Sequence, residues 1–310
     1  MLVPDVREVV RGAFGRGAEQ SKGAGAASQK IAVVTDSCAD VPADVALKLG
    51  IRVVPLHINY REESYRDRAD IQPHEVYARF DEEIPKTSLP SPAEVVDVFD
   101  ELVAEGYTHV AVISISSGLS GTFDMMRSVA AGYGALHIEV VDTRSIALGA
   151  GFVAIAAAQA VCAGESFEAV MQAAHEAAAK TQVFFCVGTL DYLYAGGRIG
   201  KVTHSLGTAF DIRPIITCDD EGTYVTCAKA HGRKASLKKT IAAAQAALGD
   251  SQAYRVAIVH GAAEEEARAI YERAAELFSH AREVYFEQIS PALVVHTGPG
   301  LIGIGVQRMD

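Results

Sequence analysis

Tryptophan is absent from this 310-residue chain, and aromatic residues make up only 7% of it. A surface that binds nucleic acid needs exposed rings on which bases stack, or clustered lysine and arginine that neutralise phosphates. The chain has few rings, and its formal net charge of −11 leaves no basic surplus. We therefore expect no nucleic-acid partner.

Cysteine is scarce and follows no recognisable spacing. The five cysteines form no C-x-x-C pair, and no cluster of residues has the spacing of metal ligands. We expect neither a metal nor another cofactor, and an odd count without a paired framework is typical of the reducing cytoplasm. We expect the cysteines to be small core residues. They are Cys38, Cys162, Cys186, Cys218 and Cys227.

Long hydrophobic runs are also missing. The most apolar stretch, residues 149–162, is too short and too rich in alanine to span a bilayer, so it predicts a buried helix. The first residues carry charges such as Asp5 and Arg7 where the apolar core of a signal peptide would stand. These features predict a cytoplasmic protein with at most transient membrane contact.

The chain is long enough for two domains, and its hydrophobic content of 49% provides a core for each. Residues 1–28 are rich in Gly, Ala, Ser and charge without apolar periodicity, which predicts a flexible N-terminal extension. In residues 29–180, short apolar strands alternate with helical patterns, as in an α/β domain with a mainly parallel sheet. In residues 181–310, two adjacent strands flank a turn at 219–222, which predicts a hairpin and a second α/β domain with a mixed sheet.

Several elements are predicted from local pattern alone. They are a strand over 51–58, a charged loop over 60–70, helices over 122–132 and 264–280, and a closing strand-like segment over 299–306.

The segment 116–122, with the sequence SSGLSGT, gathers hydroxyl groups between an apolar strand and a helix. The free amides of a first helical turn favour a negative charge, so a carboxylate, phosphate or other small anion is expected there. In the simpler interpretation, Ser117 or Ser120 only caps the helix.

Three more segments bring hydroxyl groups to strand ends or loops, at 35–37, 86–88 and 142–145. Ligands of open α/β sheets bind beyond the carboxyl ends of the strands and often between domains. Because no phosphate-binding loop carries a lysine, we expect a pocket with hydroxyl groups at its mouth and apolar residues behind. Such a pocket suits an anionic head on an apolar body.

Five motifs in this order resemble the DegV family, bacterial fatty-acid-binding proteins that present acyl chains to a separate fatty acid kinase. The motifs are TDS at 35–37, KTSLPS at 86–91, SGLSGT at 117–122, LYAGGRI at 193–199 and HTGPG at 296–300. The resemblance runs from about Lys30 to the C-terminus. It implies two α/β domains with a long-chain fatty acid in an apolar tunnel between them.

The same resemblance implies a role for individual residues. The carboxylate of the fatty acid would accept hydrogen bonds from Ser120 and from either Thr87 or Ser88, with His296 nearby in the HTGPG turn. The residues implied for the ligand are Thr87, Ser88, Ser120, Gly121, Thr122 and His296.

The resemblance also implies a partner. Arg198 and Arg233, expected to be exposed, would belong to the region that meets the kinase. The kinase would bring ATP and transfer the phosphoryl group, so this chain would not itself be an enzyme.

Two other functions fit parts of the sequence. Gly118, Ser120 and Thr122 approach the G-x-S-x-G pattern of serine hydrolases, with His296 as the base, although the fifth position is threonine. Residues 149–154 match the dinucleotide-binding pattern G-x-G-x-x-A, but no acidic residue ends a strand about 20 positions later.

Overall fold

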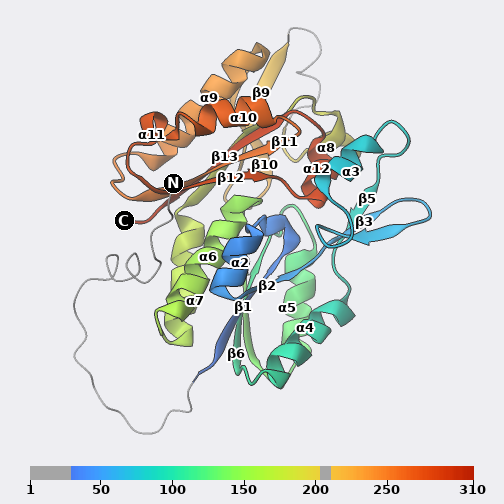
Figure 1. The fold of residues 1–310 in the computed structure, drawn as a ribbon, viewed down its shortest axis with the longest axis vertical. Helices are drawn as coiled ribbons and strands as arrows, with labels where there is room; N and C mark the ends of the chain where they lie inside the picture. Colours follow the sequence, from blue (N-terminus) through green and yellow to red (C-terminus); the bar gives the residue numbers. More distant parts are fainter. Residues whose placement is uncertain (1–28, 203–210) are drawn as a thin grey trace.

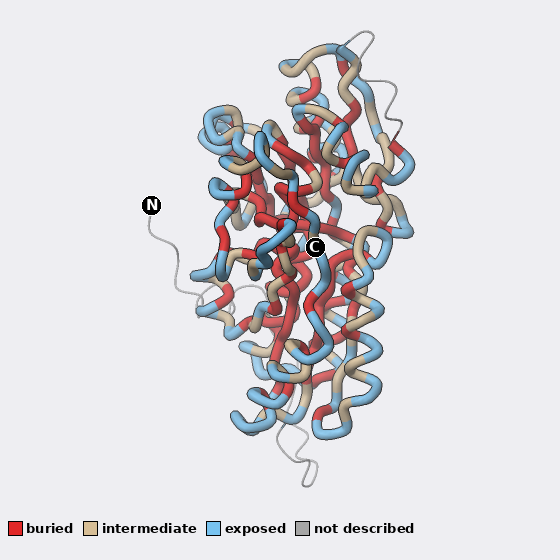
Figure 2. Tube along the Cα trace, turned by 90° about the vertical axis from the view of Figure 1, so that its right-hand side faces the viewer, coloured by how far each residue is buried: buried red, intermediate tan, exposed pale blue. Residues whose placement is uncertain are grey.

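The computed structural model describes residues 29–202 and 211–310. The extension predicted over residues 1–28 therefore lies outside the described residues. Two main sheets form two halves of the molecule, and helices fill the space between them and cover their outer faces (Figure 1). The buried backbone is concentrated along the middle of the molecule (Figure 2).

The first sheet is parallel throughout, as predicted, in the order β2-β1-β6-β7. Its strands are β1 (Ile31–Asp36), β2 (Ile51–Val54), β6 (His109–Ser114) and β7 (His137–Asp142). Alternate residues of β1 and β6 enter separate cores on the two faces, so both strands read as continuous apolar runs. The helices around it are α2 (Ala43–Leu49), α4 (Pro92–Ala104), α5 (Thr122–Gly132), α6 (Leu148–Cys162) and α7 (Phe167–Ala179).

The second sheet is mixed, also as predicted, in the order β10-β9-β8-β13-β11-β12. Only β11 and β12 pair in parallel, and the predicted hairpin is β9 with β10. Its strands are β8 (Thr181–Cys186), β9 (Ile212–Cys218), β10 (Tyr224–His231), β11 (Tyr254–Gly261), β12 (Ala281–Gln288) and β13 (Leu301–Arg308). Helix α9 (Gly232–Leu248) covers its outer face together with α10 (Glu264–Tyr271) and α11 (Ala274–Leu277).

The strand predicted over 51–58 is wrong as a single element. Pro55 lacks a backbone N–H and interrupts it, so β2 ends at Val54 and β3 (His57–Asn59) enters another sheet. In that third, antiparallel sheet, β3 lies between β4 (Ser64–Arg66) and β5 (Lys86–Ser88). The charged loop predicted over 60–70 therefore contains a strand.

The helices also differ from the prediction at two places. The helix predicted over 264–280 is broken at Glu272 and Arg273 into α10 and α11. A helix that the sequence did not predict, α12 (Pro291–Thr297), precedes the closing strand. Pro291 at its first position suits a helix start, and its apolar residues are buried between α3 (Pro73–Ala78) and α8 (Asp191–Ala195).

Helix α6 joins the two halves, because it contacts strands of both main sheets. It is buried almost all round, as predicted for its apolar sequence. The chain passes between the sheets through α6 and α7, and the domain boundary at residue 180 stays a prediction.

Two glycines of α6 approach neighbouring elements closely. A Cβ on Gly149 would overlap Ser145 and Val183, and a Cβ on Gly151 would overlap the Ala39 carbonyl. Close packing thus accounts for the G-x-G-x-x-A pattern.

The cysteine prediction holds only in part. Cys38 and Cys186 are buried in the core, and Cys218 is half-buried. Cys162 and Cys227 are exposed, since they lie near the end of α6 and on β10, so the prediction is wrong for these two.

The close approach of α6 allows a first prediction. Gly149→Ala is expected to lower the free energy of unfolding by about 1–3 kcal/mol, because the added methyl overpacks against Ser145 and Val183. Gly132→Ala is the matched control: nothing lies within 4 Å of its new Cβ, and alanine favours the helix. Urea denaturation of both variants measures the difference, and equal stabilities would contradict the packing argument.

Candidate functional site

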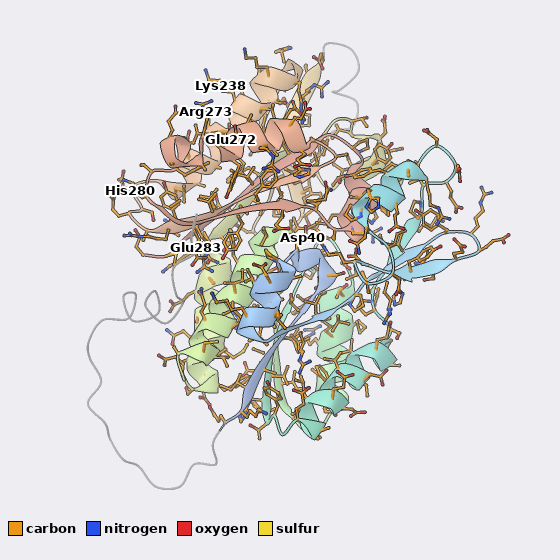
Figure 3. The ribbon with its side chains drawn as sticks, in the orientation of Figure 1. Asp40, Lys238, Glu272, Arg273, His280 and Glu283 are labelled. Atoms are coloured by element: carbon orange, nitrogen blue, oxygen red, sulfur yellow. The ribbon has the colours of Figure 1, made fainter. Side chains whose placement is uncertain are left out.

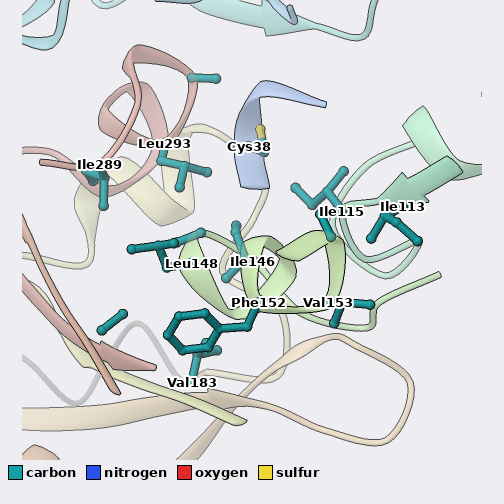
Figure 4. Packing of buried hydrophobic residues seen from close by; sticks show 14 of the residues in the cluster. Cys38, Ile113, Ile115, Ile146, Leu148, Phe152, Val153, Val183, Ile289 and Leu293 are labelled. Carbon is teal, nitrogen blue, oxygen red and sulfur yellow. The ribbon is translucent and has the colours of Figure 1, made fainter. Parts of the chain in front are cut away.

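An apolar cavity lies between α6, α12 and the inner face of the mixed sheet. Its empty volume is about 450 Å³, including the part open to solvent. Strands β8, β11 and β13 contribute Val183, Phe185, Ala257, Val259, Gly303 and Gly305. The helical side includes Ile146, Leu148, Leu293 and Thr297. In Figure 4, Ile289 and Leu293 lie on one side of Leu148, and Phe152 and Val183 on the other.

A polar pair lies beside this cavity. Thr87 Oγ1 is 2.7 Å from Nε2 of His296, which directly precedes the cavity residue Thr297 in α12. Side chains alternate along a strand, so Ser88 points away from Thr87. Ser88 Oγ accepts a hydrogen bond from Asn59 Nδ2 instead, at 3.0 Å. Of the two hydroxyls that the sequence left open, only Thr87 contacts His296.

His296 lies in the last turn of α12, so its predicted place in a turn is wrong. Burial, assisted by the charge of Arg198, lowers the pKa of His296 to about 4, and the imidazole is neutral near pH 7. Its Nδ1 has no hydrogen-bond partner among the described residues. Gly196 lies against this nitrogen, and a Cβ there would overlap it. Only glycine at position 196 therefore leaves room for the imidazole ring of His296.

In the hydroxyl-rich segment 116–122, the first two serines bond to other elements of the fold, whereas Ser120 and Thr122 bond to each other. Ser116 Oγ donates to the Gly222 carbonyl at 2.8 Å, and Ser117 Oγ donates to Asp142 at 2.6 Å. These two serines tie the loop to the hairpin turn of the second sheet and to the end of β7. Ser117 therefore does not cap α5.

Ser120 and Thr122 lie at the start of α5, where Gly121 is the N-cap residue. Ser120 Oγ is 2.8 Å from Thr122 Oγ1 and accepts a hydrogen bond from the Thr122 amide at 3.3 Å. Gly121 is exposed, and a Cβ there would lie 3.8 Å from the Leu89 side chain. Leu89 comes two residues after Thr87, so this loop adjoins the strand that carries Thr87.

Arg198 links the same elements. Its Nη1 donates to the Gly196 carbonyl at 2.8 Å and its Nε to the Leu119 carbonyl at 3.4 Å. The predicted exposure of Arg198 is wrong, because the residue is half-buried. It lies among the residues around His296.

Arg233 is also half-buried, so its predicted exposure is wrong too. It lies in the first turn of α9, and its guanidinium pairs with Glu266 of α10 at 2.6 Å. This ion pair joins two helices on the outer face of the mixed sheet.

The sequence did not predict that three buried carboxyl groups, those of Asp36, Asp40 and Asp67, hold neighbouring segments together. Asp40 accepts a hydrogen bond from the Ser290 amide at 3.0 Å, and Asp67 accepts one from the Ala292 amide at 3.2 Å. Asp36 accepts from the Ile115 amide at 2.8 Å and so joins the end of β1 to that of β6. Figure 3 shows Asp40 where the two halves of the molecule meet. Ser37 of the TDS motif donates to Asp67 at 2.6 Å, so the motif is joined through Asp67 to the start of α12.

Neither alternative function gains support from these contacts. In the described part of the chain, Ser120 and His296 share no hydrogen bond, and no carboxylate pairs with His296 Nδ1, as a hydrolase triad requires. No group of three His, Cys, Asp or Glu residues able to hold a metal occurs within residues 29–202 and 211–310. No helix among those described is long and apolar enough to cross a membrane.

The fold and the site thus define a class: an α/β protein with a parallel and a mixed main sheet and an apolar cavity beside a threonine–histidine pair. The chain belongs to the DegV family, because that family's sequence profile, described as an uncharacterised protein family, matches residues 30–308. A DegV domain-containing protein of Clostridium perfringens is 39% identical over 282 residues, covering 90% of this chain and 99% of the relative. One from Clostridium acetobutylicum is 37% identical over 276 residues, covering 89% and 98%.

Solved structures show the same fold. A fatty-acid-binding DegV family protein from Thermus thermophilus has a TM-score of 0.84 at 31% identity, covering 90% of this chain and all (100%) of that one. DegV of Bacillus subtilis, described as a fatty acid binding protein, has a TM-score of 0.83 at 28% identity, with coverage of 91% and 100%. A stearic acid-binding protein from Eubacterium ventriosum has a TM-score of 0.80 at 28% identity, with coverage of 90% and 99%.

Proposed function

We propose that this protein binds a long-chain fatty acid in the apolar cavity and presents its carboxylate to a separate fatty acid kinase for acyl-phosphate formation. The observation that carries the proposal is the position of the Thr87–His296 pair next to a cavity with an almost wholly apolar lining. Similar proteins described as fatty acid binding support the same ligand class.

The acyl chain supplies most of the affinity. Each buried methylene contributes about 0.8 kcal/mol, so about 15 methylenes contribute roughly 12 kcal/mol before ordering costs. A hydrogen bond from a hydroxyl to a charged carboxylate adds only about 1.5–3 kcal/mol. The cavity therefore holds the ligand, and the hydroxyl groups orient its head.

The neutral state of His296 determines how Thr87 acts. A buried N–H without a hydrogen-bond partner costs more free energy than an unpaired acceptor nitrogen. Because Nδ1 of His296 has no partner, the ring proton belongs on Nε2, next to Thr87. Thr87 Oγ1 then accepts from the histidine, and its own O–H is free to donate to the carboxylate. Ser120 and Thr122 supply further hydroxyls at the start of α5, with Gly121 between them.

The head group remains available for chemistry. Hydroxyl groups bind a carboxylate without the bidentate hold of an arginine, so the kinase's phosphoryl donor has access to a carboxylate oxygen. This chain then supplies the acyl substrate, and the kinase performs the transfer. Arg198, between the loop of Ser120 and His296, is proposed to meet the kinase. Arg233 stays a more distant predicted contact.

Mass spectrometry of the purified protein tests this proposal directly. Under native conditions we expect a non-covalent adduct of fatty-acid mass at one molecule per chain, and organic extraction should release the intact acid. An empty protein that hydrolyses a short aryl ester, with activity lost in Ser120→Ala, would overturn the proposal in favour of the hydrolase. Acyl-phosphate formation on addition of a fatty acid kinase and ATP tests the presentation step separately.

A further inference from the structure

We propose that Phe152 of α6, which lies directly behind the cavity-lining residues Gly149 and Gly305, stops the acyl chain at the inner end of the cavity and sets the longest chain that the protein accepts. This inference rests on the proposed function, since it assumes an acyl chain in the cavity. It concerns the end of the cavity away from the Thr87–His296 pair.

The floor of the cavity runs along β13. Gly303 and Gly305 line it without side chains, and Val259 and Ala257 line it from the paired positions of β11. The floor therefore begins near α12, at Leu301, and ends at Gly305. Four residues of strand correspond to a length of about 13 Å.

Helix α6 comes close to the sheet at Gly305. A Cβ on Gly305 would lie 3.7 Å from the Gly149 amide nitrogen and 3.8 Å from Cε2 of Phe152. These are ordinary van der Waals distances, so the space beside Gly305 holds about one methyl group before it meets the helix and the Phe152 ring. Phe152 is fully buried, and its ring lies beside Val183 in Figure 4. A chain that enters from the α12 side meets this ring.

A buried charge lies behind Phe152. Arg255 shares the inner face of β11 with Ala257, two residues further from α12, and its guanidinium carbon is 5.8 Å from the Phe152 ring centre. Its side chain is only 2% exposed; Nη2 donates to Gln159 at 2.9 Å, and Nε faces Glu283 at 3.6 Å. An acyl chain that extended past Phe152 would place apolar methylenes against this buried charge, which adds to the cost of a longer chain.

The test compares a series of saturated fatty acids, from laurate to arachidate, on the delipidated full-length protein. Each extra methylene that finds apolar space raises affinity about fourfold. Stearate has two more methylenes than palmitate, so in Phe152→Ala we expect the stearate-to-palmitate ratio of affinities to rise roughly 15-fold over the unchanged protein. Calorimetry or displacement of a fluorescent fatty acid provides the ratio.

Two variants keep the result interpretable. Phe152→Leu preserves more of the core and should shift the ratio in the same direction, should the alanine variant fail to fold. Val153→Ala removes buried volume from the same helix on the side of Ile113 and Ile115, so its ratio should not change (Figure 4). A folded Phe152 variant with an unchanged ratio overturns this inference, whereas an unchanged protein that binds no member of the series overturns the proposed function.

Discussion

Thr87→Val is expected to weaken fatty acid binding by about 10- to 100-fold, because it removes a hydrogen bond to a charged carboxylate worth about 1.5–3 kcal/mol. Valine keeps the shape of threonine and leaves the apolar cavity intact, so the residual affinity reports the acyl chain alone. The substitution also deprives His296 Nε2 of its partner at 2.7 Å. Calorimetric titration of the delipidated protein with palmitate measures the change.

The neighbouring hydroxyls provide matched controls. Thr87→Ser keeps the hydroxyl and should retain most of the affinity. Ser88→Ala removes only the contact with Asn59 on the other face of β5, so binding should be unchanged. A loss of affinity in Ser88→Ala together with normal binding in Thr87→Val would contradict the proposal, because it would place the carboxylate on the Ser88 face of β5.

Ionisation of Asp67 and Asp36 is expected to lower the stability of the folded protein as the pH rises from about 4 to 7. His296, whose pKa burial lowers to about 4, acts in the opposite direction below about pH 6.5. Burial raises the pKa of Asp67 to about 7 and that of Asp36 to about 6, while an unfolded aspartate titrates near 3.9. Between these values the folded state binds protons that the unfolded state has released, so its stability falls with rising pH and levels off above the folded pKa. For Asp67 the whole effect from about pH 4 to pH 7 is on the order of 4 kcal/mol, of which about 2 kcal/mol falls between pH 5.5 and pH 8.

Asp67→Asn tests the origin of this loss. The amide cannot ionise but still presents an oxygen to the Ala292 amide and an N–H₂ group toward Ser37. Urea denaturation at pH 5.5 and pH 8 should show a smaller difference in this variant, with Asp36 responsible for part of the remainder. Asp97→Asn on the exposed side of α4 should keep the full difference. An identical pH dependence in all three proteins would refute the assignment to Asp67.

Local pattern predicted the fold well where neighbours in sequence determine the structure. The apolar runs of β1 and β6, the hairpin of β9 and β10, and the buried helix α6 all follow from composition, periodicity and turn residues. The pattern failed at α12, whose apolar residues show no amphipathic period because α3 and α8 enclose them.

The site illustrates the same division. The sequence singled out Thr87, Ser120 and His296, but 209 positions separate Thr87 from the histidine that it contacts. Asp40 and Asp67 carried no motif of their own, because their role depends on the amides of α12, which lie more than 200 positions away along the chain.

The sequence by itself determined the two α/β halves, the parallel and mixed sheets and the motifs of the DegV family. Only the tertiary structure decided which of Thr87 and Ser88 meets His296, that Arg198 is half-buried, and that Asp40 and Asp67 accept hydrogen bonds from the amides of Ser290 and Ala292. Periodicity, capping and turn chemistry act over a few residues. Burial and side-chain partners are set by segments brought together from distant parts of the chain, and no local pattern records them.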